Sequence, residues 1–159
     1  MIAGFAGHQN LGDEGTLKWV QEQLTKVVLE LTITGGWTSL AAGADQLFAQ
    51  VLLEHRIPYM VVVPCQSYEK TFSEQELTLY RLFRSKEAKA ILLGFDEPSE
   101  IAFYEAGKRV VDESELLIAV WDGAPAHGLG GTGDIVQYAQ AQRKIVIHVN
   151  HVLGQTRKI

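Results

Sequence analysis

Ionisable side chains stand where apolar runs of the sequence end. Asp122 follows the run LLIAVW, and His8 follows the run that opens the chain. A carboxylate there can accept hydrogen bonds from ribose hydroxyls, or serve as nucleophile or charge stabiliser when an N-glycosidic bond is cleaved. A loop histidine can act as an acid or donate to a phosphate. Asp122 is therefore the best-placed candidate carboxylate, and His8 is a candidate acid or phosphate contact.

Two glutamates in the segment after Pro98 are further catalytic candidates, Glu100 and Glu105. The segment is expected to be a helix that borders a cleft. Both glutamates also have a structural explanation. Glu100 lies in the first turn, where the helix dipole favours negative charge. Glu105 has the i,i+4 spacing of an ion pair with Arg109.

Glycines concentrate in three segments, Gly4–Gly12, Ala41–Asp45 and Gly128–Asp134, each of which follows an apolar run. Glycine lets the backbone approach a ligand closely and adopt positive φ. A helix that follows such a loop offers unpaired N–H groups to an anion. Eight residues are therefore predicted to contact a phosphorylated ligand: Gly7, His8, Gly43, Asp45, Gly130, Gly131, Thr132 and Gly133. Thr132 is also expected to cap its helix, and capping is the alternative explanation of Asp45.

These loops do not match the common nucleotide-binding fingerprints. The first glycines fall at positions 4, 7 and 12, which is not the spacing G-x-G-x-x-G, and the chain has no G-K-[ST]. The polar segment Gln66–Phe72 carries two aromatic residues, Tyr68 and Phe72, either of which can stack on a base.

Apolar runs alternate with helical patterns along the whole chain, which predicts a three-layer, Rossmann-like α/β fold with a doubly wound, mainly parallel sheet. In such sheets ligands bind at the carboxyl ends of the strands. We expect one domain over residues 1–159. The predicted strands are 1–6, 39–42, 59–63, 90–93, 116–121 and 145–149, and the predicted helices are 14–31, 45–55, 73–88, 98–112 and 134–142.

Composition narrows the class of protein. The chain has 159 residues, of which 47% are hydrophobic and 21% charged, as in ordinary globular domains. No apolar run is long enough for a membrane helix, and the first residues lack the basic region of a signal peptide. The single cysteine, Cys65, permits no internal disulfide. We therefore expect a cytoplasmic protein.

The charge balance bears on partners. The net charge of −5 makes a nucleic acid duplex an unfavourable partner, because binding to DNA rests on phosphate neutralisation by basic residues. The five histidines have no paired spacing, so no metal site is predicted, and no resident cofactor is predicted. The expected partner is a nucleotide-like small molecule, with no membrane partner.

The segments Val111–Gly123 and Gly130–Ala139, which include Gly130-Gly131-Thr132-Gly133, resemble the SLOG superfamily. This Rossmann-like group contains the LOG phosphoribohydrolases, the DprA/Smf proteins and the YpsA-like proteins. The early Gly4–His8 segment and the Ala42–Asp45 turn are similar to its first two ligand loops. The resemblance implies a nucleotide-derived ligand with its phosphate near the Gly-Gly-Thr loop, and homo-oligomers.

The sequence departs from the LOG pattern G-G-x-G-T-x-x-E. The position of that glutamate is Ile135, which has no acid–base chemistry, and the frequent His-Arg pair after the first strand reads His8-Gln9. Three hypotheses follow. The chain binds a nucleotide or nucleotide-derived ligand; or it is a nucleotide N-glycosidase or deoxyribosyltransferase; or it is a non-catalytic protein-interaction module, whose glycines would tolerate alanine wherever φ is negative.

Overall fold

A computed structural model describes all 159 residues and contains one seven-stranded sheet. The strand order is β4-β3-β2-β1-β5-β6-β7, and every pair is parallel except the antiparallel pair β6–β7. The strands are β1 (Ile2–Gly7), β2 (Gly35–Thr38), β3 (Tyr59–Cys65), β4 (Lys89–Phe95), β5 (Leu116–Val120), β6 (Ile145–Asn150) and β7 (Gln155–Lys158). The predicted fold class is confirmed.

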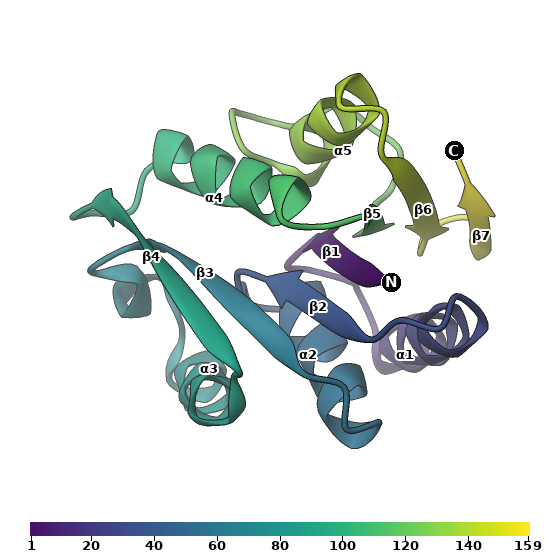
Figure 1. Cartoon of the computed structure of the whole chain (residues 1–159), viewed down its shortest axis with the longest axis horizontal. Coiled ribbons are helices and arrows are strands. Elements are labelled where there is room, and N and C mark those ends of the chain that lie inside the picture. Colours follow the sequence, from purple (N-terminus) through teal and green to yellow (C-terminus); the bar gives the residue numbers. More distant parts are fainter.

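Helices cover both faces of the sheet (Figure 1). The first three helices of the chain pack on one face of the sheet and the last two pack on the other. From β1 the chain adds β2, β3 and β4 toward one edge and then β5, β6 and β7 toward the other, so the direction of strand addition reverses between β1 and β5. The helices are α1 (Glu14–Glu30), α2 (Ala44–Glu54), α3 (Glu74–Lys86), α4 (Glu100–Asp112) and α5 (Thr132–Ala141), with a short 3₁₀ helix η1 (Tyr68–Thr71). This reversal is where an open α/β sheet offers a ligand crevice.

The sheet forms the centre of the core. All five residues of β5 are buried, as the apolar run LLIAV requires of a strand covered on both faces. Phe5 of β1 stacks on Phe48 of α2, with ring centroids 4.6 Å apart. No helix of the structure combines the length and apolar character needed to cross a membrane.

Side-chain caps fix where several helices begin. The Ser73 hydroxyl accepts from the amide of Glu76, and the Glu76 carboxylate accepts from the amide of Ser73, which completes the predicted capping box. Asp13 and Ser99 cap α1 and α4 by accepting from the amides of Thr16 and Ala102. Of these three helices, α4 borders the cavity described below.

The second strand was predicted at residues 39–42, and this prediction is wrong. Gly35 and Gly36, which indicate a turn in the sequence, lie within β2, Gly35–Thr38. A Cβ on Gly36 would lie 2.5 Å from Leu52 of α2. The glycine is needed because helix α2 packs directly on the strand, and residues 39–42 are therefore free to form a loop.

Two elements were not predicted. Residues 68–71 form η1, and the chain returns after β6 to add β7 at the edge of the sheet. The strand β7 is short, and three of its four residues are exposed, so it has no apolar signal that would distinguish it from a tail.

Candidate functional site

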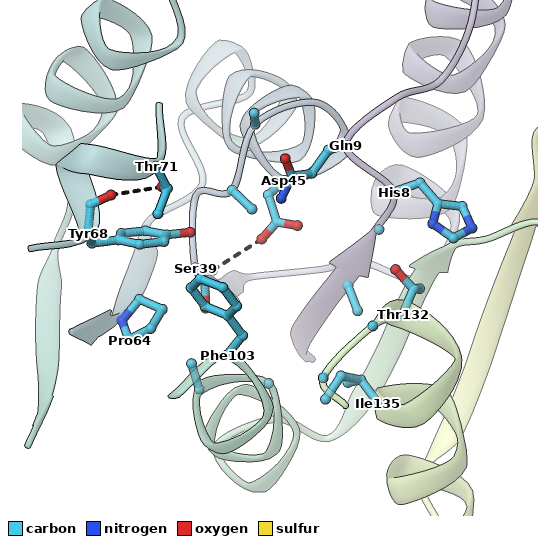
Figure 2. Close-up of a pocket in the computed structure, with 18 of the residues that line it drawn as sticks. His8, Gln9, Ser39, Asp45, Pro64, Tyr68, Thr71, Phe103, Thr132 and Ile135 are labelled. Carbon is cyan, nitrogen blue, oxygen red and sulfur yellow. Dashed lines mark hydrogen bonds between the residues drawn. The ribbon is translucent and has the colours of Figure 1, made fainter. Parts of the chain in front are cut away.

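A cavity of about 450 Å³ lies at the carboxyl ends of β1, β2 and β3. Figure 2 shows it open between the loops after these strands, with α4 and α5 below. The N-terminal regions of α2, α4 and α5 all contribute lining residues, such as Asp45, Ser99 and Thr132. Three helix N-termini therefore meet at one cavity, and the positive ends of their dipoles favour a bound anion.

The α5 end of the cavity carries unused hydrogen-bond donors. The amides of Gly131, Thr132 and Gly133 have no acceptor within the chain. Gly131 is the N-cap of α5 and Thr132 its first residue, so the predicted capping role of Thr132 is wrong. The Thr132 hydroxyl, which has no partner in the chain, is instead available to the cavity.

The loop before α5 is held by backbone packing. Gly130 has φ of +89°, and its amide donates to the Asp134 carboxylate at 3.0 Å. A Cβ on Gly131 would lie 2.8 Å from that of Ala126, and one on Gly133 would lie 2.9 Å from a backbone oxygen. Both residues have negative φ, so close packing rather than conformation requires glycine there. Alanine at these positions therefore does not separate a binding role from a structural one.

Asp45 lies in the middle of the cavity wall, and only 5% of its surface is exposed. Its Oδ2 accepts from the Thr38 hydroxyl at 2.7 Å and from the amide of Ser39 at 3.2 Å. The residue therefore does not cap its own helix, whose N-cap is Gly43. Burial raises the pKa of Asp45 to about 7, although its hydrogen bonds oppose the shift.

The other end of the cavity is aromatic. Tyr68 and Phe72, which the sequence indicates as base-stacking residues, both line it, together with Phe103 of α4. The rings of Tyr68 and Phe72 meet edge to face, with centroids 5.0 Å apart. Figure 2 shows Tyr68 and Phe103 across the cavity from Thr132 and His8. The cavity thus has a polar end and an aromatic end, with Asp45 between them.

The cavity wall contains no lysine or arginine. Its titratable side chains are His8, Asp45 and Tyr68. His8 lines the polar end, and its Nε2 accepts from the amide of Asp122 at 3.2 Å while lying 3.3 Å from Asp122 Oδ1. Protonation of His8 turns this nitrogen into a donor to the carboxylate. A negative ligand must therefore be held mainly by backbone amides and helix dipoles.

The predicted ligand contacts mostly converge. Six of the eight line the cavity: Gly7, His8, Asp45, Gly130, Gly131 and Thr132. Gly43 and Gly133 do not line the cavity, although the amide of Gly133 is one of the unused donors of α5. Gly43 has φ of +81°, and a Cβ there would overlap the backbone of Gln9. Their roles in ligand contact stay predictions.

The three predicted catalytic carboxylates do not line the cavity. Asp122 accepts from the amide of Ala124, which is the main cause of its lowered pKa, and lies behind His8. Glu100 lies against the loop at Gly128. Glu105 pairs with Lys108 at 2.7 Å, so the expected pair with Arg109 is wrong.

Sequence reasoning missed the loop residues Gln9, Ser39 and Ala41, which also line the cavity. Ser39 was assigned to a strand, so no ligand role was considered for it, whereas Gln9 and Ala41 lie in predicted glycine-rich segments but were not named as contacts. The sequence carries one signal for this segment, the pair Gly35-Gly36. If these two glycines had been assigned to the second strand, residues 39–42 would have been predicted as the loop that follows it.

Comparison of the sequence with protein-family models and with curated proteins finds no match. The structure is similar to DNA processing protein A (DprA) from Streptococcus pneumoniae, with a TM-score of 0.68 and 15% identity, over 92% of this chain and 49% of that one. It is also similar to Helicobacter pylori DprA, described for its single-stranded DNA binding mode (TM-score 0.67, 13% identity, 93% and 64% of the chains). The chain thus spans about half to two thirds of these DprA chains.

A third similar structure is the molybdenum cofactor binding protein from Rippkaea orientalis. The TM-score is 0.60 and the identity 19%, over 92% of this chain and 74% of that one. At these identities the likeness concerns the fold. The chain shares the Rossmann-like α/β fold of these structures.

Proposed function

We propose that the chain belongs to the SLOG superfamily and that its cavity binds a nucleotide or nucleotide-derived ligand, whose phosphate lies against the N-terminus of α5. The observation that carries the proposal is the set of three unpaired amides at Gly131, Thr132 and Gly133, beside His8. Backbone N–H groups at a helix N-terminus are well suited to phosphate oxygens. The Thr132 hydroxyl supplies a fourth donor.

The aromatic end supports a base at the other end of the ligand. Tyr68, Phe72 and Phe103 offer ring faces and edges, and a planar base stacks favourably on such rings. The absence of lysine and arginine from the wall favours a ligand with one phosphate over a polyphosphate. A nucleoside monophosphate, or another nucleotide with a single phosphate, fits both ends.

Calorimetric titration with nucleoside 5′-monophosphates and the matching nucleosides tests this proposal. The wild type is expected to bind at least one monophosphate, and its nucleoside at least tenfold more weakly. Thr132→Val should weaken monophosphate binding about tenfold, because hydrogen bonds to charged groups contribute about 1.5–3 kcal/mol. The substitution breaks no hydrogen bond of the fold, since the Thr132 hydroxyl has no partner.

Thr78→Val on the exposed surface of α3 is the matched control, and its affinity should be unchanged. Equal affinity for monophosphates and nucleosides, or no binding at all, would contradict the proposal. A single-stranded oligodeoxynucleotide belongs in the same series because of the DprA likeness. If the oligonucleotide binds more tightly than every monophosphate, the ligand is a strand of DNA and not a free nucleotide.

A second candidate function is hydrolysis of the N-glycosidic bond. The observation that favours it is the position of Asp45, a carboxyl near the middle of the cavity with a pKa of about 7. In this reaction water adds to the anomeric carbon, the bond to the base breaks, and the base leaves with a proton. An ionised Asp45 can take the proton from water or stabilise the positive sugar centre.

Release of free base, followed by chromatography, tests the second candidate. Activity should be lost in Asp45→Asn and retained in Glu105→Gln, because Glu105 lies outside the cavity. No free base from any nucleotide at high protein concentration would leave binding as the function. The same assay tests the catalytic roles predicted for Asp122 and Glu100, because neutralising a catalytic carboxylate lowers the rate. A lower rate in Glu105→Gln would contradict its use as the control and would support the catalytic role predicted for Glu105.

A further inference from the structure

The buried carboxyl of Asp45 has acceptor capacity that the fold does not use. Both of its short hydrogen bonds, from Thr38 and Ser39, go to Oδ2. The amide of Ala41 also acts on this carboxyl. An ionised carboxylate has about four acceptor positions, so at least one position remains for a ligand. Asp45 is 5% exposed and lines the cavity, so the acceptor position that the fold leaves unused is available to a ligand.

The hydroxyl of Tyr68 is a second unpartnered group at the same place. Tyr68 is 4% exposed, and its hydroxyl makes no hydrogen bond within the chain. Figure 2 shows this hydroxyl directed across the cavity toward Asp45. Burial, and then the Asp45 charge, hold the pKa of Tyr68 well above its usual value, so the hydroxyl keeps its proton and can donate.

Asp45 lies between the two ends of the cavity, and the hydroxyl of Tyr68 is directed toward it from the aromatic end. The α5 end holds the unpaired amides, and the aromatic end holds Phe72 and Phe103. In a nucleotide the sugar separates the phosphate from the base. We propose that Asp45 and Tyr68 together bind the cis-diol of a ribose, so that the ligand is a ribonucleotide and not a deoxyribonucleotide. This inference rests on the proposed function.

The chemistry of the pair fits a diol. One sugar hydroxyl donates to Asp45 Oδ1, and the neighbouring hydroxyl accepts from the Tyr68 hydroxyl. A deoxyribose leaves one of these two buried groups without a partner. A site built to hydrogen-bond a ligand group discriminates strongly against an analogue that lacks it, because the protein group then stays desolvated and unpaired.

The test is a calorimetric comparison at pH 8, where Asp45 is mostly ionised. The ligands are the four ribonucleoside 5′-monophosphates with their 2′-deoxy and 3′-deoxy analogues. The wild type is expected to bind a ribonucleotide at least tenfold more tightly than either deoxy analogue. Tyr68→Phe should reduce this preference at least threefold, and Asp45→Asn should do the same.

Tyr80→Phe is the matched control, because Tyr80 is a buried tyrosine whose hydroxyl contacts Arg84 and which does not line this cavity. Its preference for ribose should equal that of the wild type. Circular dichroism and thermal melting confirm that each variant is folded.

The outcomes separate the two claims. If ribonucleotides and their deoxy analogues bind the wild type with equal affinity, the diol site is wrong and the proposed function stands. The same holds if the preference persists undiminished in both Tyr68→Phe and Asp45→Asn. If no monophosphate binds, both the proposed function and the diol site are wrong.

Discussion

Replacement of Asp45 by asparagine should stabilise the protein, and the gain should grow as the pH rises. Asparagine is nearly isosteric, and its carbonyl oxygen can accept from Thr38 and Ser39, which both donate to a single carboxylate oxygen. These two hydrogen bonds therefore survive. What the substitution removes is a buried carboxyl that must ionise at alkaline pH.

The magnitude follows from the pKa of Asp45. Burial raises this pKa from 3.8 to about 7, so the folded state holds the proton more tightly than the unfolded state. Between these two values the unfolded state loses its proton first, and the stability of the wild type falls as the pH rises. From pH 5 to pH 8 the loss is on the order of 2–3 kcal/mol, at 1.36 kcal/mol for each pKa unit.

Thermal melting of the wild type and Asp45→Asn at pH 5, 6, 7 and 8 measures the effect. All other titrating groups are common to both proteins, so the difference in Tm isolates Asp45. For a domain of this size 1 kcal/mol corresponds to about 2–4 °C. The Tm gap in favour of Asp45→Asn should therefore widen by about 5–10 °C between pH 5 and pH 8.

A Tm difference between the two proteins that is constant with pH would contradict this prediction, because Asp45 would then have the same pKa in the folded and unfolded states. A gap that narrows as the pH rises would mean that the ionised carboxylate is stabilised by the fold. Thr78→Val on the exposed surface of α3 is the control, because it removes no ionisable group and its Tm gap from the wild type should not change with pH.

Three further substitutions test the framework of the site. Gly43→Ala should lower the free energy of unfolding in urea by at least about 3 kcal/mol, because its Cβ would meet the backbone of Gln9 at positive φ. Gly12→Ala is the control: its φ is +90° but its Cβ would meet no atom, so the loss should be about 1 kcal/mol. Equal losses in the two variants would contradict the packing argument. Ser73→Ala removes the capping box of α3 and should lower the free energy of unfolding by about 1 kcal/mol, whereas an unchanged urea midpoint would show that the cap contributes nothing. Asp134→Ala removes the acceptor of the Gly130 amide and should weaken monophosphate binding severalfold by calorimetry, whereas Asp134→Asn should restore it. Full affinity in the alanine variant would mean that the hydrogen bond from Gly130 to Asp134 does not position the loop.

Most of the fold could be predicted from local patterns. The β-branched and apolar runs of β3, β5 and β6 identify strands, because strands covered on both faces need continuous apolar sequence. The capping box identifies the start of α3. The strand β2 was misplaced because Gly36 serves a contact with Leu52, which is distant in sequence, and a pair of glycines looks the same in a turn.

The position of the glycine loops at the polar end of the cavity was also predictable, because loops that follow parallel strands lie at the carboxyl edge of the sheet. The surroundings of the carboxylates were not predictable. An aspartate in the first turn of a helix reads as a cap, and only tertiary packing directs Asp45 to Thr38 and the cavity. Asp122 follows a strand at the correct edge, but its side chain folds back onto the Ala124 amide. The direction of a side chain after a strand depends on the turn, and sequence spacing does not reveal it.

The most direct test of the phosphate site is a titration followed by ¹H–¹⁵N spectra of the backbone amides. A nucleoside monophosphate is added to the wild type, and its unphosphorylated nucleoside to a second sample. We expect the largest phosphate-dependent shifts at the amides of Gly131, Thr132 and Gly133, with none at Thr78 on α3. Shifts that are equal for both ligands at these amides, or that gather elsewhere on the protein, would contradict the central claim that the N-terminus of α5 holds a phosphate.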